Sequence, residues 1–88
     1  PSLHVYMHEL AVTKMLIDQL LAQLQGRKVK EVTKVVVHIG ELTSYKPEPV
    51  QYYFNLAREE HPLLARASLE THVISGNQII LKNIEVKD

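Results

Sequence analysis

A histidine and a glutamate, His8 and Glu9, stand side by side just before a long run of apolar residues at helical spacing. An imidazole beside a carboxylate could bind a transition-metal ion. The chain contains no cysteine, so its five histidines and its carboxylates are the strong ligands available, and any metal site must use nitrogen and oxygen. Helix initiation explains the same pair without a metal, because the helix dipole favours a carboxylate in the first turn. Both interpretations stay open on these two residues alone.

A third candidate ligand, His4, lies four residues before His8. In a helix that extended back to His4, the two imidazoles would share one face and could form a two-histidine site of modest affinity. Leu3 and Val5 alternate with their more polar neighbours, however, and this alternation favours a short edge strand. An edge strand at residues 1–6 could pair with a second copy of the chain and give a homo-oligomer.

The remaining histidines lack the spacing of metal ligands, and the glycines lack the spacing of enzyme motifs. His38, His61 and His72 show no paired spacing, so we do not expect them to be metal ligands. We expect His38 to be a polar strand residue, His61 to be a cation at a helix end, and His72 to be an exposed strand residue. The three glycines form neither a Gly-x-Ser-x-Gly motif nor a phosphate-binding loop. We therefore expect a binding protein without enzyme activity.

Length and charge limit the remaining possibilities. The 88 residues fit a single domain, residues 1–88. Ten Lys and Arg residues balance ten Asp and Glu residues, so nothing favours binding to nucleic acid or to an anionic membrane. No apolar run reaches the roughly 18–20 residues that cross a bilayer, and the first residues lack the pattern of a secretory signal. These features predict a cytoplasmic protein with no nucleic-acid or membrane partner.

Two helices and three strands are expected to position the candidate ligands. Apolar residues, Met15 among them, recur at helical spacing over residues 10–24, and Gly26 suits the helix end. The other predicted elements are a β-branched strand within residues 29–42, a helix from about 49 to 61 that buries Val50, Tyr53, Phe54 and Ala57, and two strands within 65–74 and 78–86. This order predicts a two-layer α/β sandwich, with both helices packed on one face of a three-stranded sheet.

The arrangement of the strands is predicted from turn and parity signals. Residues 75–77, Ser-Gly-Asn, give a turn signal, so the last two strands are expected to form a hairpin. A crossover through the second helix would then leave a gap that the final strand fills, in the middle of the sheet. The apolar side chains of the final strand change faces midway, which predicts a β-bulge near Lys82 and Asn83.

Three segments in register resemble one protein family. They are Met7–Leu10 (MHEL), Ile39–Leu42 (IGEL) and Ile84–Val86 (IEV), and the wider resemblance covers residues 7–88. The chain resembles the HypA (HybF) family of nickel-incorporation proteins for [NiFe]-hydrogenase and, in some bacteria, urease. The resemblance implies a non-enzymatic carrier that hands Ni(II) to a hydrogenase-maturation GTPase or to the hydrogenase large subunit. The alternative function is a HypA-like interaction or structural domain that has lost metal delivery.

The sequence departs from the family pattern in two places. Family members carry a zinc-binding insertion with two Cys-x-x-Cys pairs, whereas this chain passes directly from Ile74 to Ser75, so no zinc site is expected. Family members also begin at the methionine of Met-His-Glu and can use its amine as a ligand. Here residues 1–6 precede Met7, which therefore offers an amide, and an amide is deprotonated for metal binding at far greater cost.

The resemblance also implies a set of nickel ligands. His8 would bind Ni(II) with Glu9 nearby, and Glu41, at the end of the predicted first strand, would supply a second carboxylate. The predicted fold brings this strand end close to the start of the first helix. A structural explanation stays equally open, in which Gly40 and Glu41 lead the chain out of the sheet and Gly40 adopts an unusual dihedral angle.

Overall fold

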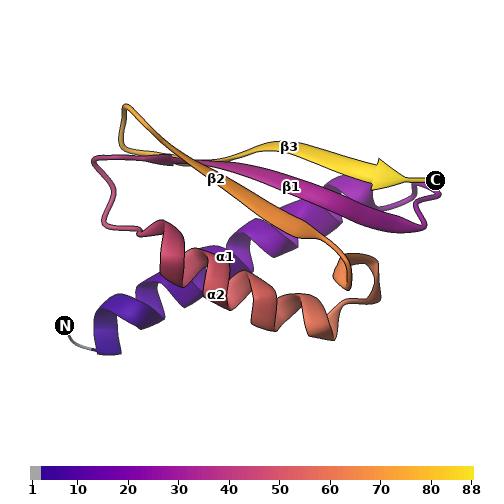
Figure 1. Ribbon diagram of the computed structural model, residues 1–88, viewed down its shortest axis with the longest axis horizontal. Helices are drawn as coiled ribbons and strands as arrows, with labels where there is room; N and C mark the ends of the chain where they lie inside the picture. Colours follow the sequence, from indigo (N-terminus) through magenta and orange to yellow (C-terminus); the bar gives the residue numbers. More distant parts are fainter. Residues whose placement is uncertain (1–2) are drawn as a thin grey trace.

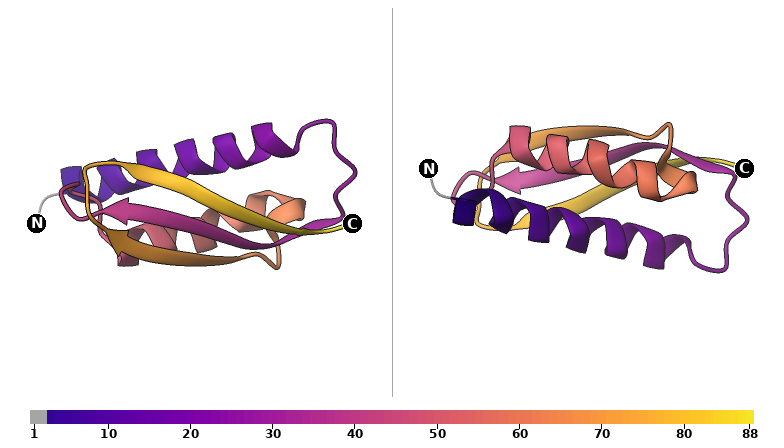
Figure 2. Two further views of the ribbon diagram at one scale, coloured as in Figure 1. Left: turned by 90° about the horizontal axis from the view of Figure 1, so that it is seen from above. Right: turned by 90° about the horizontal axis from the view of Figure 1, so that it is seen from below.

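The computed structural model describes the backbone of residues 3–88 and the side chains of residues 8–88. Its elements are α1 (Leu3–Leu24), β1 (Glu31–Gly40), α2 (Pro47–Ala57), the short 3-10 helices η1 (Arg58–Glu60) and η2 (Pro62–Leu64), β2 (Ser68–Ile74) and β3 (Ile79–Lys87) (Figure 1). Seen from below, α1 and α2 lie side by side in front of the sheet, whose other face neither helix covers (Figure 2). The predicted two-layer α/β sandwich is confirmed.

The core lies between the two helices and the inner face of the sheet. Its buried side chains are Val12, Leu16, Ile17, Leu20, Leu24, Val32, Val35, Val37, Ile39, Val50, Phe54, Leu64, Ala67 and Leu69. The helical spacing of the α1 members explains why this helix buries one stripe. Met15 was predicted within that stripe and is 59% exposed, so the prediction was wrong for this residue.

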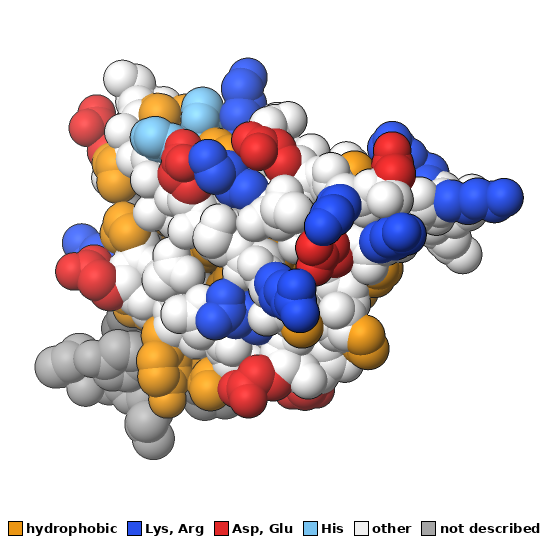
Figure 3. All heavy atoms as spheres, turned by 45° about the vertical axis from the view of Figure 1, so that its right-hand side comes forward, with side chains coloured by type: hydrophobic (Ala, Val, Ile, Leu, Met, Phe, Trp, Pro, Cys, Tyr) orange, Lys and Arg blue, Asp and Glu red, His pale blue; other side chains and the backbone are white. Residues whose placement is uncertain are grey.

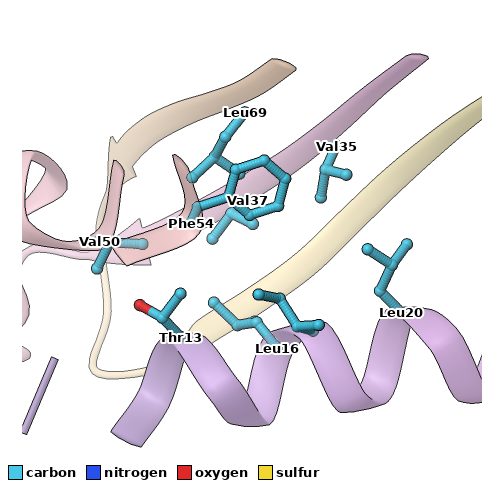
Figure 4. Close-up of a pocket in the computed structure, with 9 residues that line it drawn as sticks. Thr13, Leu16, Leu20, Val35, Val37, Val50, Phe54 and Leu69 are labelled. Atoms are coloured by element: carbon cyan, nitrogen blue, oxygen red, sulfur yellow. The ribbon is translucent and has the colours of Figure 1, made fainter. Parts of the chain in front are cut away.

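A small apolar cavity remains between α1, α2 and the sheet (Figure 4). Thr13 contributes a hydroxyl to its lining, and this hydroxyl donates a hydrogen bond to the Glu9 carbonyl oxygen at 2.7 Å. Ligand pockets combine apolar walls with free polar groups that orient the ligand. Because the Thr13 hydroxyl is already bonded, we interpret this cavity as packing space within the core.

Helix α1 begins earlier than the apolar pattern indicated. It starts at Leu3, so the edge strand predicted for the first six residues is wrong for residues 3–6, and residues 1–2 lie outside the described part of the chain. Because residues 3–6 are helical, they do not supply the added strand through which a homo-oligomer was predicted. The helix ends as predicted, at Leu24 before Gly26, whose φ of 81° only glycine adopts readily.

The strand order is β2-β1-β3, with β1 parallel to β2 and antiparallel to β3. The predicted hairpin and the central position of the last strand were therefore wrong. Residues 75–78 arch over the end of β1 instead, and three backbone hydrogen bonds join Gly40 and the two residues after it to this arch and to the end of β2. The amides of Gly40, Glu41 and Leu42 donate to the carbonyl oxygens of Gln78, Ile74 and Gly76 at 2.8, 2.7 and 2.9 Å.

Gly40 is required at this crossing for space. A Cβ atom there would lie 2.5 Å from the Gly76 carbonyl oxygen and 2.7 Å from the Gly76 carbonyl carbon. The unusual dihedral angle predicted for Gly40 is absent, because the described glycines with positive φ are Gly26 and Gly76. Close approach of two backbone segments is the physical reason for this residue.

The bulge predicted in β3 is confirmed. Val36 pairs with Asn83 and Val37 pairs with Leu81, so Lys82 is the extra residue. Beyond the bulge the faces exchange, and the apolar side chains from both halves of β3 pack against the core: Ile79, Leu81, Ile84 and Val86. Within residues 3–88, no helix combines the length and hydropathy that crossing a bilayer requires.

Candidate metal centre

The His8 imidazole lies on the exposed surface of α1, in the second turn of the helix. Its two ring nitrogens face hydroxyl groups from the turn after β1, with 3.4 Å from Nδ1 to Ser44 Oγ and 3.4 Å from Nε2 to Tyr45 Oη. The His8 and Tyr45 ring centroids are 4.8 Å apart. Both contacts are long for hydrogen bonds, so a ligand could displace either hydroxyl at small cost.

The neighbouring carboxylate of Glu9 is buried, with 1% of the residue exposed. Its Oε2 accepts a hydrogen bond of 2.5 Å from the backbone amide of Lys46, the N-cap residue of α2. Lys46 makes no side-chain capping bond of its own, so Glu9 caps α2 from another helix and places its charge at the positive end of the α2 dipole. The first turn of α1 holds no acidic residue, so the interpretation in which Glu9 helps to initiate α1 was wrong.

The second oxygen of this carboxylate, Oε1, is buried and has no hydrogen-bond partner among the described residues. An unpaired buried polar group costs about 1–3 kcal/mol. Such a group in a native protein calls for an explanation, and an ion or a water molecule is a common one. Glu9 therefore has a structural role at Oε2 and a buried oxygen, Oε1, for which the described residues supply no partner.

The turn that meets both side chains is held in place by the end of β1. The Thr43 amide and hydroxyl both donate to the Gly40 carbonyl oxygen, at 3.0 and 2.8 Å, and the Tyr45 amide donates to Thr43 Oγ1 at 3.3 Å. Together with the arch over β1, these bonds direct Ser44, Tyr45 and Lys46 towards α1. The predicted closeness of the β1 end to the N-terminal part of α1 is confirmed by their contacts with His8 and Glu9.

The other two predicted ligands are placed differently. Glu41 is exposed in the turn after β1, and its amide bonds to the carbonyl oxygen of Ile74. The backbone at His4 belongs to α1, one turn before His8, and its side chain lies outside the described residues. Among residues with described side chains, no three His, Cys, Asp or Glu residues are arranged to hold a metal ion. The assignment of His8, Glu9, Glu41 and His4 as ligands stays a prediction.

Sequence reasoning missed the partners that surround these side chains. The hydroxyls of Ser44 and Tyr45 and the amide of Lys46 contact α1 from a turn that is distant from it in the sequence. A weak signal exists in Pro47 and Pro49, which mark the entry of α2, because a helix entry needs an acceptor for its first amides. Glu9 is that acceptor.

Comparison with known proteins identifies the family. The family model described as "Hydrogenase/urease nickel incorporation, metallochaperone, hypA" matches residues 7–78. The chain is 53% identical over 53 residues to hydrogenase maturation factor HypA of Caldanaerobacter subterraneus, covering 60% of the chain and 46% of that protein. It is 39% identical over 64 residues to HypA of Moorella thermoacetica, covering 73% of the chain and 56% of that protein.

A third relative, HypA of Geobacter sp. strain M21, is 36% identical over 70 residues, which cover 80% of the chain and 60% of that protein. The chain therefore spans about half the length of the curated relatives it matches. No solved structure gives a significant match. The family model covers most of the chain, and on that basis the chain belongs to the HypA family of hydrogenase and urease nickel-incorporation proteins.

Proposed function

We propose that this domain binds Ni(II) at His8 and delivers it to a partner protein during maturation of [NiFe]-hydrogenase. The protein acts as a carrier, and nickel is its cargo. The observation that carries the proposal is the buried Glu9 Oε1, which has no partner among the described residues although it belongs to the residue next to an exposed imidazole. A cation bound by His8 would give this oxygen a partner.

The surroundings of His8 support a site that loads and unloads readily. Imidazole nitrogen suits Ni(II), and the ring is exposed on the surface of α1. The hydroxyls of Ser44 and Tyr45, each 3.4 Å from a ring nitrogen, hold the ring weakly until a metal replaces one of them. Weak, exchangeable coordination is what transfer between proteins requires, because a tightly enclosed ion would leave slowly.

His4 and Glu41 are proposed as further ligands because of where they lie along the chain. Position 4 lies one helical turn before His8 in α1, and residues four apart share a helix face. Glu41 opens the turn whose later residues Ser44 and Tyr45 contact His8, so it lies at the same end of the sheet as the proposed site. We assign His4 and Glu41 as secondary ligands, and the charge of Glu9 as the main electrostatic support.

The partners follow from family membership. Because the relatives are named hydrogenase maturation factors, we expect the protein that receives nickel to act in the same process. We propose a maturation GTPase or the hydrogenase large subunit. These encounters would take place in the cytoplasm. A HypA-like interaction domain without metal delivery is the alternative, and it is supported if nickel fails to bind at His8.

Site-resolved NMR tests this proposal. Ni(II) is titrated into ¹⁵N-labelled protein, and we expect the amide signals of His8 and of residues 44–46 to shift or broaden first. The His8→Ala variant should lose this response, whereas the matched His61→Ala variant, which changes a partly exposed histidine in another part of the chain, should keep it. Unchanged signals at residues 8 and 44–46 after nickel addition would reject the proposal.

A further inference from the structure

Two histidines that the sequence separates meet on the sheet face that the helices leave uncovered. His38 of β1 and His72 of β2 are directly paired in the parallel register. The flanking residues Val37 and Ile39 are each 1% exposed within the core, so His38 and its partner project from the opposite face. Figure 3 shows histidine side chains on the surface beside acidic and basic side chains.

The distance between the two rings suits chelation of one ion. The His38 and His72 ring centroids are 5.6 Å apart, at an interplanar angle of 80°. Metal-to-nitrogen bonds are about 2.0–2.1 Å, so two imidazoles on a tetrahedral ion have centroids roughly 5 Å apart. The observed separation exceeds this value only slightly, and small side-chain rotations would close the difference.

A neighbouring carboxylate prepares His72 for metal binding. Glu70 Oε2 lies 2.6 Å from His72 Nε2, and Glu70 Oε1 lies 3.2 Å from the Lys34 ammonium. A carboxylate oxygen accepts hydrogen bonds, so the His72 ring donates to Glu70 through Nε2. In the neutral ring with this tautomer, Nδ1 carries the lone pair that a metal ion can use.

The contact of His72 with Glu70 resembles the carboxylate contact that metal-binding histidines normally make. A ligating histidine usually donates its second ring nitrogen to a carboxylate, which fixes the tautomer and raises the basicity of the ligand. A surface ion network explains the contacts of Lys34, Glu70 and His72, and such networks contribute little to stability. It does not explain His38, whose ring packs edge-on against His72.

We propose that His38 and His72 form a second transition-metal site, on the uncovered face of the sheet, with Glu70 as the residue that orients His72. The protein supplies two nitrogen ligands, and water completes the coordination. Imidazole pairs suit Zn(II), Cu(II) and Ni(II), so the site accepts this class of cation. It is independent of the site proposed at His8.

Calorimetry with zinc chloride tests the proposal in a His8→Ala background, which removes the imidazole of the other site. The background protein should bind zinc, and adding His38→Gln or His72→Gln should weaken binding at least about tenfold, because even loss of an orienting carboxylate typically costs 10–100-fold. Glu70→Gln should fall within that range. His61→Gln is the matched control and should leave the affinity unchanged.

A second measurement identifies the coordinating atoms without any change to the pair. In ¹⁵N spectra of the histidine rings of the His8→Ala protein, zinc should shift His72 Nδ1 and one nitrogen of His38, while His72 Nε2 keeps its proton. Equal zinc affinity in the background, His38→Gln and His72→Gln proteins would overturn the proposal. A zinc response confined to one of the two rings would overturn it as well.

Discussion

Replacing Glu9 separates the structural role of its carboxylate from its proposed role with nickel. Glu9→Ala removes the charge-assisted hydrogen bond to the Lys46 amide, worth about 1.5–3 kcal/mol, and one buried methylene group worth about 0.8 kcal/mol. It also removes the unpaired Oε1, which returns about 1–3 kcal/mol. The net loss of unfolding free energy is about 1 kcal/mol, equivalent to a fall in Tm of roughly 4–8 °C for a domain of this size.

Glu9→Gln is the matched variant, because it keeps the methylene groups and an acceptor oxygen for Lys46. It loses only the charge facing the α2 dipole, so its stability should stay within about 1 kcal/mol of the unsubstituted protein. The assay is urea unfolding followed by circular dichroism, in EDTA. An alanine variant as stable as the unsubstituted protein would refute the conclusion that this carboxylate holds α2.

Three further predictions concern the arch over β1, the bulge in β3 and the turn that contacts α1. Gly40→Ala forces the Gly76 carbonyl away and should cost about 1–3 kcal/mol in urea unfolding, and an unchanged midpoint would contradict the close approach. Deletion of Lys82 removes the bulge and turns the last apolar side chains of β3 out of the core, so the cooperative unfolding transition should be lost; its survival would show that the register can adjust. Tyr45→Phe removes the hydroxyl near His8 and should change stability by no more than about 0.5 kcal/mol, as measured by the same unfolding assay, while nickel still shifts the His8 amide signal. A nickel response lost in this variant would make the hydroxyl a required part of the site.

Local patterns predicted the elements that depend on local chemistry. The parity change in β3 predicted the bulge at Lys82, and helical spacing predicted that Val50 and Phe54 are buried. The strand order was missed because the Ser-Gly-Asn turn at residues 75–77 looks like a hairpin turn in isolation. Its backbone bonds to the end of β1 join segments more than thirty residues apart, which no local pattern encodes.

In the candidate site too, the sequence predicted the local motif but not the contacts with distant residues. The Met-His-Glu motif directed attention to His8 and Glu9, but the hydrogen bond of the Glu9 carboxylate comes from Lys46, which lies 37 residues away in the sequence. The pairing of His38 with His72 was missed because the expected sheet placed another strand between β1 and β2. The parallel register places the two histidines opposite each other, on the face of the sheet that the helices leave uncovered.

Anomalous diffraction at the nickel edge, from crystals of the nickel-loaded protein, tests the central claim most directly. We predict a peak within coordination distance of a His8 ring nitrogen, close to the Glu9 carboxylate. Nickel bound elsewhere, with the His8 ring still facing the hydroxyls of Ser44 and Tyr45, would contradict it.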